Sequence, residues 1–142
     1  MPECLFCAIA AGNIPSASLY EDGRVMAFLD IRPLAPGHAL VVPKHHAAKL
    51  EQADPADRHA LMDAVAKLTP VLCKATGTRD ATIAINNGPD AGQEVQHVHI
   101  HIIPRAASDG AGPIHNLFEH RPKPSSEELH DLAVRVQTTL GA

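Results

Sequence analysis

Three histidines, His97, His99 and His101, alternate with apolar residues over residues 96–103. Because alternate side chains of a β-strand share one face, this spacing predicts a strand with the imidazoles on one face and the apolar side chains in the core. Such a row suits metal binding or nucleophilic and acid–base catalysis. The alternative is an ordinary polar strand face, but polar positions filled only by histidine make that alternative weaker.

Metal binding and catalysis place different demands on these histidines. Three successive same-face side chains of one strand rarely give good tetrahedral geometry around zinc. A nucleophilic imidazole flanked by two orienting imidazoles needs less convergence. An imidazole is also partly neutral at cellular pH and leaves well once protonated. Catalysis is therefore the favoured interpretation of the row.

Five short strands are expected to carry these residues. The patterns predict strands at residues 19–21 and 25–29, joined by the turn dipeptide Asp22-Gly23, and at 39–43, 82–85 and 96–103. Asp54-Pro55 predicts the start of a helix whose apolar stripe is Leu61, Val65, Leu68 and Leu72. Pro70 is expected to kink or shorten that helix, and Gly77 to end it.

A capping box of Ser125 and Glu128 predicts a last helix. Strands outnumber helices and are joined mostly by short turns, so the expected fold is α+β: a mainly antiparallel five-stranded sheet with two helices. We expect a single domain over residues 1–142, in which residues 106–142 form an irregular segment plus the C-terminal helix.

Composition excludes several classes of function. The net charge of −4 gives no basic surface for a nucleic-acid backbone. The N-terminus lacks a secretory pattern, and no segment approaches the roughly 20 apolar residues of a membrane span. Three cysteines do not make a disulfide framework and fit a reducing compartment. These features predict a soluble, cytoplasmic protein without nucleic-acid or membrane partners.

The histidine row and four further blocks resemble the histidine triad family. His97-Val-His-Ile-His-Ile-Ile matches the family signature His-x-His-x-His-x-x, in which x is apolar. The resemblance continues upstream through residues 86–96 and downstream through Pro104-Arg105, and it includes residues 28–31 and 37–46. These blocks occur in the family's order and cover most of the chain before Arg105.

The resemblance implies a hydrolase of nucleoside phosphoramidates or dinucleoside polyphosphates, acting on a purine nucleotide through a nucleotidyl-histidine intermediate. By this similarity His99 is the nucleophile, His101 contacts phosphate oxygens, and His97 supports His99 or binds metal. The nucleotide-binding residues implied are Phe28 and Ile31 around the base, Asp30 on the ribose, and Asn86, Gly92, Gln93 and Glu94 near the phosphate. The family usually forms homodimers, and no organic cofactor is expected.

Glu94 departs from the family pattern, since many members carry Ser or Thr there to donate to the leaving group. A carboxylate at this position repels phosphate unless it is protonated, or pairs with a cationic leaving group. Two alternatives stay open: transfer of the nucleotidyl group to a phosphate acceptor instead of water, and a nucleotide-binding module with weak catalysis, which the presence of Glu94 keeps open.

Cys4-x-x-Cys7 has the short ligand spacing of zinc sites, but the chain has no second pair of this kind. Its resemblance to microbial histidine triad proteins with the same N-terminal motif implies a structural zinc held by Cys4, Cys7, His46 and His97. His45 is an alternative to His46. The plain alternative is two reduced cysteines without metal. Cys73 lies near the apolar stripe of the first predicted helix and is expected in the core.

Overall fold

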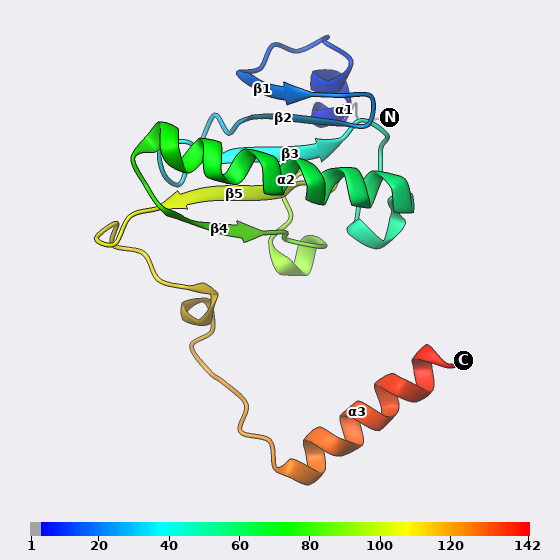
Figure 1. The fold of residues 1–142 in the computed structure, drawn as a ribbon. Helices are drawn as coiled ribbons and strands as arrows, with labels where there is room; N and C mark the ends of the chain where they lie inside the picture. The colour runs from blue at the N-terminus through cyan, green and yellow to red at the C-terminus, as the bar shows by residue number, and fades with distance from the viewer. Residues whose placement is uncertain (1–3) are drawn as a thin grey trace. The chain divides into compact units, whose positions relative to one another are not determined.

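The computed structural model describes residues 4–142 and divides them between two compact units, residues 4–109 and 110–142. The first unit contains a five-stranded antiparallel sheet with the strand order β1-β2-β3-β5-β4 (Figure 1). The strands are β1 (Ser18–Glu21), β2 (Val25–Leu29), β3 (Ala39–Pro43), β4 (Asp80–Ala84) and β5 (Ile100–Arg105). The predicted α+β class and its antiparallel sheet are confirmed.

Helix α2 (Pro55–Thr76) covers one face of the sheet. Its predicted stripe packs with the inward residues of β2, β3 and β5 in one buried cluster that includes Val25, Val41 and Ile102. Gly77 ends the helix with a φ of 70°, a left-handed conformation that suits glycine. The helix is not shortened at Pro70, and a kink there stays a prediction. Pro70 and Ala66 are exposed, so water can satisfy the carbonyl that the proline leaves without a donor.

A short helix that the sequence analysis did not predict, α1 (Leu5–Ala10), contributes to the other face. Its Phe6 and Ile9 join Met26, Phe28 and Leu40 in a second buried cluster. The Cys4 thiol caps this helix by accepting from the Cys7 amide at 3.5 Å. The structure therefore has three α-helices among the described residues, where two were predicted, as well as 3₁₀ turns at Leu50–Gln52, Pro89–Ala91 and Ile114–Leu117.

Strand β5 begins at Ile100, four residues later than predicted, so His97 and His99 precede it. Its pairing with β3 ends where Ile100 lies opposite Val41. Farther along β3, Pro43 has no N–H to donate, and its carbonyl instead accepts from the His97 side chain at 2.7 Å. The Val98 amide bonds outside the sheet: it donates to the Ala47 carbonyl at 2.7 Å.

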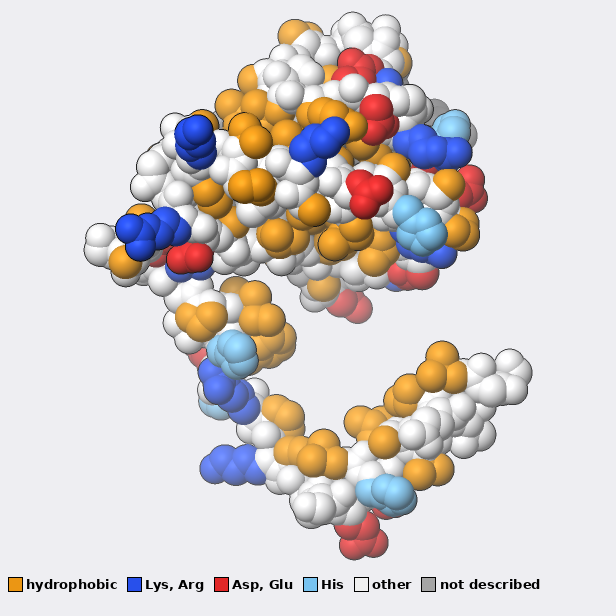
Figure 2. Space-filling view, in the orientation of Figure 1, with side chains coloured by type: hydrophobic (Ala, Val, Ile, Leu, Met, Phe, Trp, Pro, Cys, Tyr) orange, Lys and Arg blue, Asp and Glu red, His pale blue; other side chains and the backbone are white. Residues whose placement is uncertain are grey.

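The second unit contains α3 (Ser126–Leu140), which begins at the predicted capping box. The Glu128 amide donates to the Ser125 hydroxyl at 3.1 Å, and the Ser125 amide donates to the Glu128 carboxylate at 3.4 Å. Hydrophobic side chains lie along this helix (Figure 2), and those of Leu129, Leu132, Val136 and Leu140 are exposed. A single domain over residues 1–142 stays a prediction.

Within residues 4–142, no helix is long and apolar enough to cross a membrane.

Candidate functional site

A cavity of about 670 Å³ is lined by residues from both sequence halves of the first unit. Most of the predicted site residues line it: Phe28, Asp30, Ile31, Asn86, Gly92, Glu94, His99 and His101. His38 and the α1 residues Leu5, Phe6 and Ile9 also line it and were not predicted as site residues. The cavity thus joins a histidine group to an apolar wall.

His99 is buried and held at one ring nitrogen. Its Nδ1 lies 2.8 Å from the His97 carbonyl oxygen. Because a carbonyl can only accept, Nδ1 carries the proton, and in the neutral ring Nε2 keeps its lone pair. The ring also packs edge-on against Phe6 and His101, with centroid distances of 5.0 and 4.9 Å. In the neutral ring, these contacts leave one basic nitrogen, Nε2, available for attack.

His101 is held in the opposite tautomer through His38. The Leu34 amide donates to His38 Nδ1 at 3.0 Å, so the proton of neutral His38 is on Nε2. That Nε2–H lies 2.9 Å from His101 Nδ1 and donates to it. The proton of His101 is therefore on Nε2, a buried atom without a hydrogen-bond partner among the described residues. His101 is ready to donate to an oxygen placed in the cavity.

Burial keeps this pair neutral. It lowers the pKa of His101 to about 4, and the neighbouring His99 and His38 add to that lowering. Burial likewise lowers the pKa of His38 below its ordinary value. A neutral His38 has a single ring proton to donate, which maintains the tautomer of His101 near neutral pH. The sequence analysis gave His38 no role, because its partner is 63 residues away in the chain.

Asp30 lies on the other side of His38. Its Oδ1 accepts from the Arg32 amide at 2.9 Å, and its Oδ2 is 3.7 Å from His38 Nε2. The ligand atoms of Asp30, His38 and His101 lie within 4.8 Å of one another, close enough for a metal ion. The Leu34 amide, however, already takes His38 Nδ1 and leaves a proton on Nε2, the atom that faces Asp30 and His101. The hydrogen bonds therefore favour a polar chain over a metal site here.

The apolar wall differs from the predicted pair of base contacts. Phe28 is only 3% exposed and packs edge-on against Phe6, with a centroid distance of 5.5 Å. Ile31 is 90% exposed, so it borders the cavity without packing in the core. Ile9 and Phe6 from α1 add further apolar side chains to this part of the cavity.

Gln93 does not line the cavity. Its side-chain carbonyl accepts from the Gly88 amide at 2.8 Å, and its NH₂ group donates to the carbonyls of Ala48 and Val95. Its backbone amide donates to the Gly88 carbonyl. These hydrogen bonds hold Gln93 in the loop before His97, and its contact with a phosphate stays a prediction.

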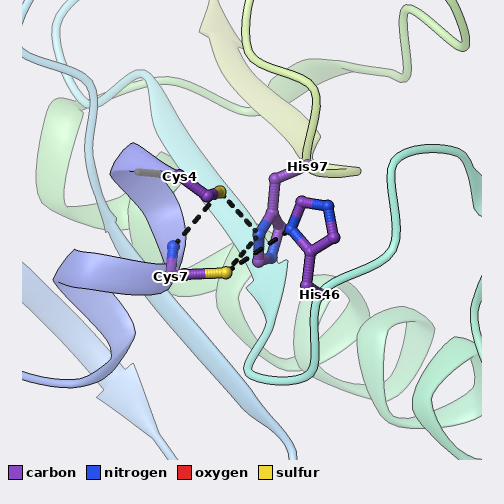
Figure 3. Close-up of side chains that lie close together, drawn as sticks. All are labelled: Cys4, Cys7, His46 and His97. Atoms are coloured by element: carbon purple, nitrogen blue, oxygen red, sulfur yellow. Dashed lines mark hydrogen bonds between the residues drawn. The ribbon is translucent and has the colours of Figure 1, made fainter. Parts of the chain in front are cut away.

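Two cysteines and two histidines form a second group of ligand atoms (Figure 3). Cys4, Cys7, His46 and His97 bring their sulfur and nitrogen atoms within 4.8 Å of one another. His97 Nδ1 is 3.3 Å from the Cys4 sulfur and 3.5 Å from the Cys7 sulfur, and His46 Nδ1 is 3.4 Å from Cys7. Two thiolates and two imidazoles at such spacings fit tetrahedral zinc.

The second ring nitrogen of His97 supports this fit. His97 Nε2 lies 2.7 Å from the Pro43 carbonyl and donates to it, which leaves the Nδ1 lone pair facing the thiols. Metal-bound histidines commonly donate their other N–H to a carbonyl in this way. Burial and the neighbouring Cys4 raise the pKa of Cys7 to about 11, which makes its thiol harder to deprotonate. A bound cation would offset this by stabilising the thiolate. His97 does not line the cavity, and its ring lies with the side chains of Cys4, Cys7 and His46.

His45 does not join this group. Its side chain is 81% exposed, and its Nδ1 is 3.5 Å from the Asp57 carboxylate. Cys73 is buried in α2, where its thiol donates to the Asp80 carbonyl at 3.6 Å. The geometry therefore favours His46 over His45 as the fourth ligand and agrees with a core position for Cys73.

Comparison with known proteins identifies the family. The model of the HIT domain matches residues 11–108. The chain belongs to the HIT family. One HIT relative, adenosine 5'-monophosphoramidase hnt1 of Schizosaccharomyces pombe, is 44% identical over 131 residues, which cover 89% of this chain and 96% of the relative. Adenylylsulfatase HINT3 of Arabidopsis thaliana is 38% identical over 88% of this chain, but the match spans only 64% of HINT3.

Solved HIT structures share the fold. The crystal structure of SMU.412c from Streptococcus mutans UA159 has a TM-score of 0.88 and 38% identity, and the match covers 99% of this chain and 87% of that one. A zinc-bound histidine triad family protein from Mycobacterium smegmatis has a TM-score of 0.71 and 30% identity, with 96% of each chain covered.

Proposed function

We propose that this HIT protein is a hydrolase of nucleoside phosphoramidates or dinucleoside polyphosphates, with a purine nucleotide bound in the 670 Å³ cavity and His99 as the nucleophile. The observation that carries the proposal is the hydrogen bond from His99 Nδ1 to the His97 carbonyl, which reserves Nε2 for attack. The hnt1 and HINT3 names, a monophosphoramidase and an adenylylsulfatase, agree with a nucleotide substrate.

In the first step, His99 Nε2 donates its lone pair to the α-phosphorus, and the P–N or P–O bond to the leaving group breaks. The leaving group departs with that electron pair and takes up a proton. In the second step, water adds to phosphorus and loses a proton, the N–P bond breaks, and the nucleoside monophosphate is released. The His99 lone pair is then restored, so the chain returns to its starting state.

The other cavity residues would bind and orient the nucleotide. The His101 Nε2–H is a buried donor suited to a non-bridging phosphate oxygen. Asp30 has one carboxylate oxygen beyond the Arg32 contact for the ribose hydroxyls. Phe28 and Ile31 would contact the base, while Asn86, Gly92 and Glu94 would lie near the phosphate and the leaving group.

We further propose a structural zinc ion held by Cys4, Cys7, His46 and His97. When bound, it would cross-link the N-terminal segment to the loops that carry the two histidines. Four protein ligands leave no open position for a reacting water, so zinc takes no part in the proposed chemistry. The zinc-bound M. smegmatis relative supports this assignment.

We also propose that the protein acts in the cytoplasm as a homodimer. The three cysteines of the chain are free, as a reducing compartment favours. The dimer follows from the resemblance to the HIT family.

The decisive substitution is His99→Ala, assayed by the release of AMP from adenosine phosphoramidate. We expect kcat to fall by at least about 10³-fold, because the attacking nitrogen is lost. AMP affinity should be largely retained. His59→Ala is the matched control, since His59 is exposed on α2 and does not line the cavity. Turnover by His99→Ala close to that of the native chain would refute the mechanism.

A further inference from the structure

The segment that carries His97 and His99 is not positioned by the sheet. The pairing of β5 with β3 ends at Ile100, so both histidines lie beyond the last strand pair. Only a few contacts place their backbone. The His97 amide donates to the Val95 carbonyl at 2.9 Å, and the Val98 amide donates to the Ala47 carbonyl at 2.7 Å. The position of the His97 carbonyl therefore depends strongly on what holds the His97 side chain.

That side chain is fully buried and held at both ring nitrogens. Nε2 donates to the Pro43 carbonyl, while Nδ1 faces the sulfurs of Cys4 and Cys7 at 3.3 and 3.5 Å (Figure 3). The His46 ring packs edge-on against it, with a centroid distance of 5.1 Å. Of the two ring nitrogens that hold the His97 side chain, Nδ1 is thus held by the proposed metal cluster.

Two sets of contacts connect the cluster to His99. The His97 carbonyl accepts the His99 Nδ1 proton at 2.8 Å, the contact that fixes which nitrogen is basic. Phe6 lies between the two cysteines in sequence and packs edge-on against both rings, with centroid distances of 5.9 Å to His97 and 5.0 Å to His99. The helix that supplies the Cys7 thiol therefore also contacts the nucleophile.

We infer that Cys4, Cys7, His46 and the His97 side chain are positioning residues for His99, and that metal binding by them sets the orientation of its imidazole. The importance of that orientation rests on the proposed function. The four side chains act through the His97 carbonyl and Phe6 and contact no substrate. A cluster that only cross-linked the N-terminal segment would affect the stability of the fold alone. A cluster that positions His99 also affects the reaction rate of the folded chain.

The test uses the full-length chain and the substitution His46→Ala, which removes an exposed ligand but leaves both thiols, Phe6 and His97 in place. His45→Ala is the control, because His45 is the exposed neighbour outside the cluster. Zinc content is measured by elemental analysis and folding by circular dichroism. The rate constant for adduct formation is measured with saturating adenosine phosphoramidate, and the dissociation constant with AMP.

Loss of zinc should lower the rate constant for adduct formation by at least about tenfold, since small misplacements of a reacting group are costly. AMP affinity should change much less. The native chain stripped with a chelator should behave like His46→Ala and recover when zinc is restored, and His45→Ala should match the native chain. An unchanged rate constant in a zinc-free folded chain would overturn the inference, as would a native chain that binds no zinc.

A second readout is independent of turnover. In ¹H–¹⁵N spectra of the imidazoles at neutral pH, the zinc-loaded chain should show a slowly exchanging His99 Nδ1 proton, assigned by its absence in His99→Ala. This signal should disappear when zinc is lost. If no chain forms an adduct, the proposed function fails, but the imidazole signal still decides the inference: its persistence without zinc would refute the positioning role.

Discussion

The two cavity histidines illustrate how hydrogen bonds divide chemical roles between identical side chains. His99 and His101 have ring centroids 4.9 Å apart, but one donates through Nδ1 and the other accepts there. Their free nitrogens are consequently opposite in character: a lone pair on His99 and a proton on His101. A nucleophile beside a donor for phosphate is the arrangement that the proposed reaction needs.

The pKa of His101 predicts a pH dependence of stability. Burial lowers this pKa from 6.5 to about 4, so the unfolded chain binds more protons than the folded chain between these values. The contribution is complete above pH 6.5 and is lost as the pH falls towards 4. Urea denaturation from pH 7.5 to 4 should show this loss, and it should be smaller in His101→Gln. Identical pH profiles for the two chains would contradict the prediction.

Glu94 should set the preference for leaving groups. It is exposed at the cavity, and no described residue forms a hydrogen bond or ion pair with its carboxylate. At a separation of ~6 Å in hydrated surroundings, with screening by salt, this charge should favour a cationic over an anionic leaving group by about 3- to 10-fold. Phosphoramidates of ethylenediamine and β-alanine provide the pair, compared by kcat/KM.

Glu94→Gln keeps the size of the side chain and removes its charge, and Glu94→Ser restores the residue common in the family. Both should move the ratio of the two kcat/KM values towards one. A ratio that is the same in all three chains would show that Glu94 does not act on the leaving group.

At the scale of elements, α2 is the main support of the sheet that carries the site. Leu61 on this helix is fully buried among residues of β2, β3 and β5, whereas its neighbour Met62 is 56% exposed. Leu61→Ala should lower the free energy of unfolding by about 2–5 kcal/mol through the cavity that it leaves. Met62→Ala should cost much less, as denaturant titration will show. Equal losses would mean that α2 does not pack as described.

Long patterns made most elements predictable from the sequence. The continuous apolar run of β3, the stripe of α2 and the Ser125 capping box each act over neighbouring residues, and all three elements formed as expected. Helix α1 was missed because six residues give less than two helical turns and no periodic stripe. The start of β5 was misplaced because the alternation includes His97 and His99, whereas the pairing with β3 begins only at Ile100.

The site was predictable where roles follow a motif and unpredictable where they depend on contacts distant in sequence. His99 and His101, which the row of histidines singled out, line the cavity, whereas His97 does not. The tautomer of His101 depends on His38, 63 residues away, and no local pattern reveals that contact. Gln93 matched the family motif, but its side-chain carbonyl accepts from the Gly88 amide, a contact that the motif does not reveal.

At the scale of the whole molecule, the chain has two compact units, and the HIT match ends at residue 108, beside the boundary between them. The proposed homodimer predicts a sedimentation mass of twice the 15.1 kDa of one chain at micromolar concentration. The His99→Ala chain should give the same mass, because His99 is buried within one chain. A native protein that sediments as a monomer at high concentration would refute the dimer.

A nucleophilic His99 becomes covalently bound to the nucleotide, and intact-protein mass spectrometry detects that bond directly. The zinc-loaded chain and its His99→Ala variant are each mixed briefly with adenosine phosphoramidate and quenched. We expect a transient gain of one adenosine monophosphate unit in the native chain and none in the variant. An adduct that persists in His99→Ala, or AMP release by the native chain with no adduct at any mixing time, would contradict the account.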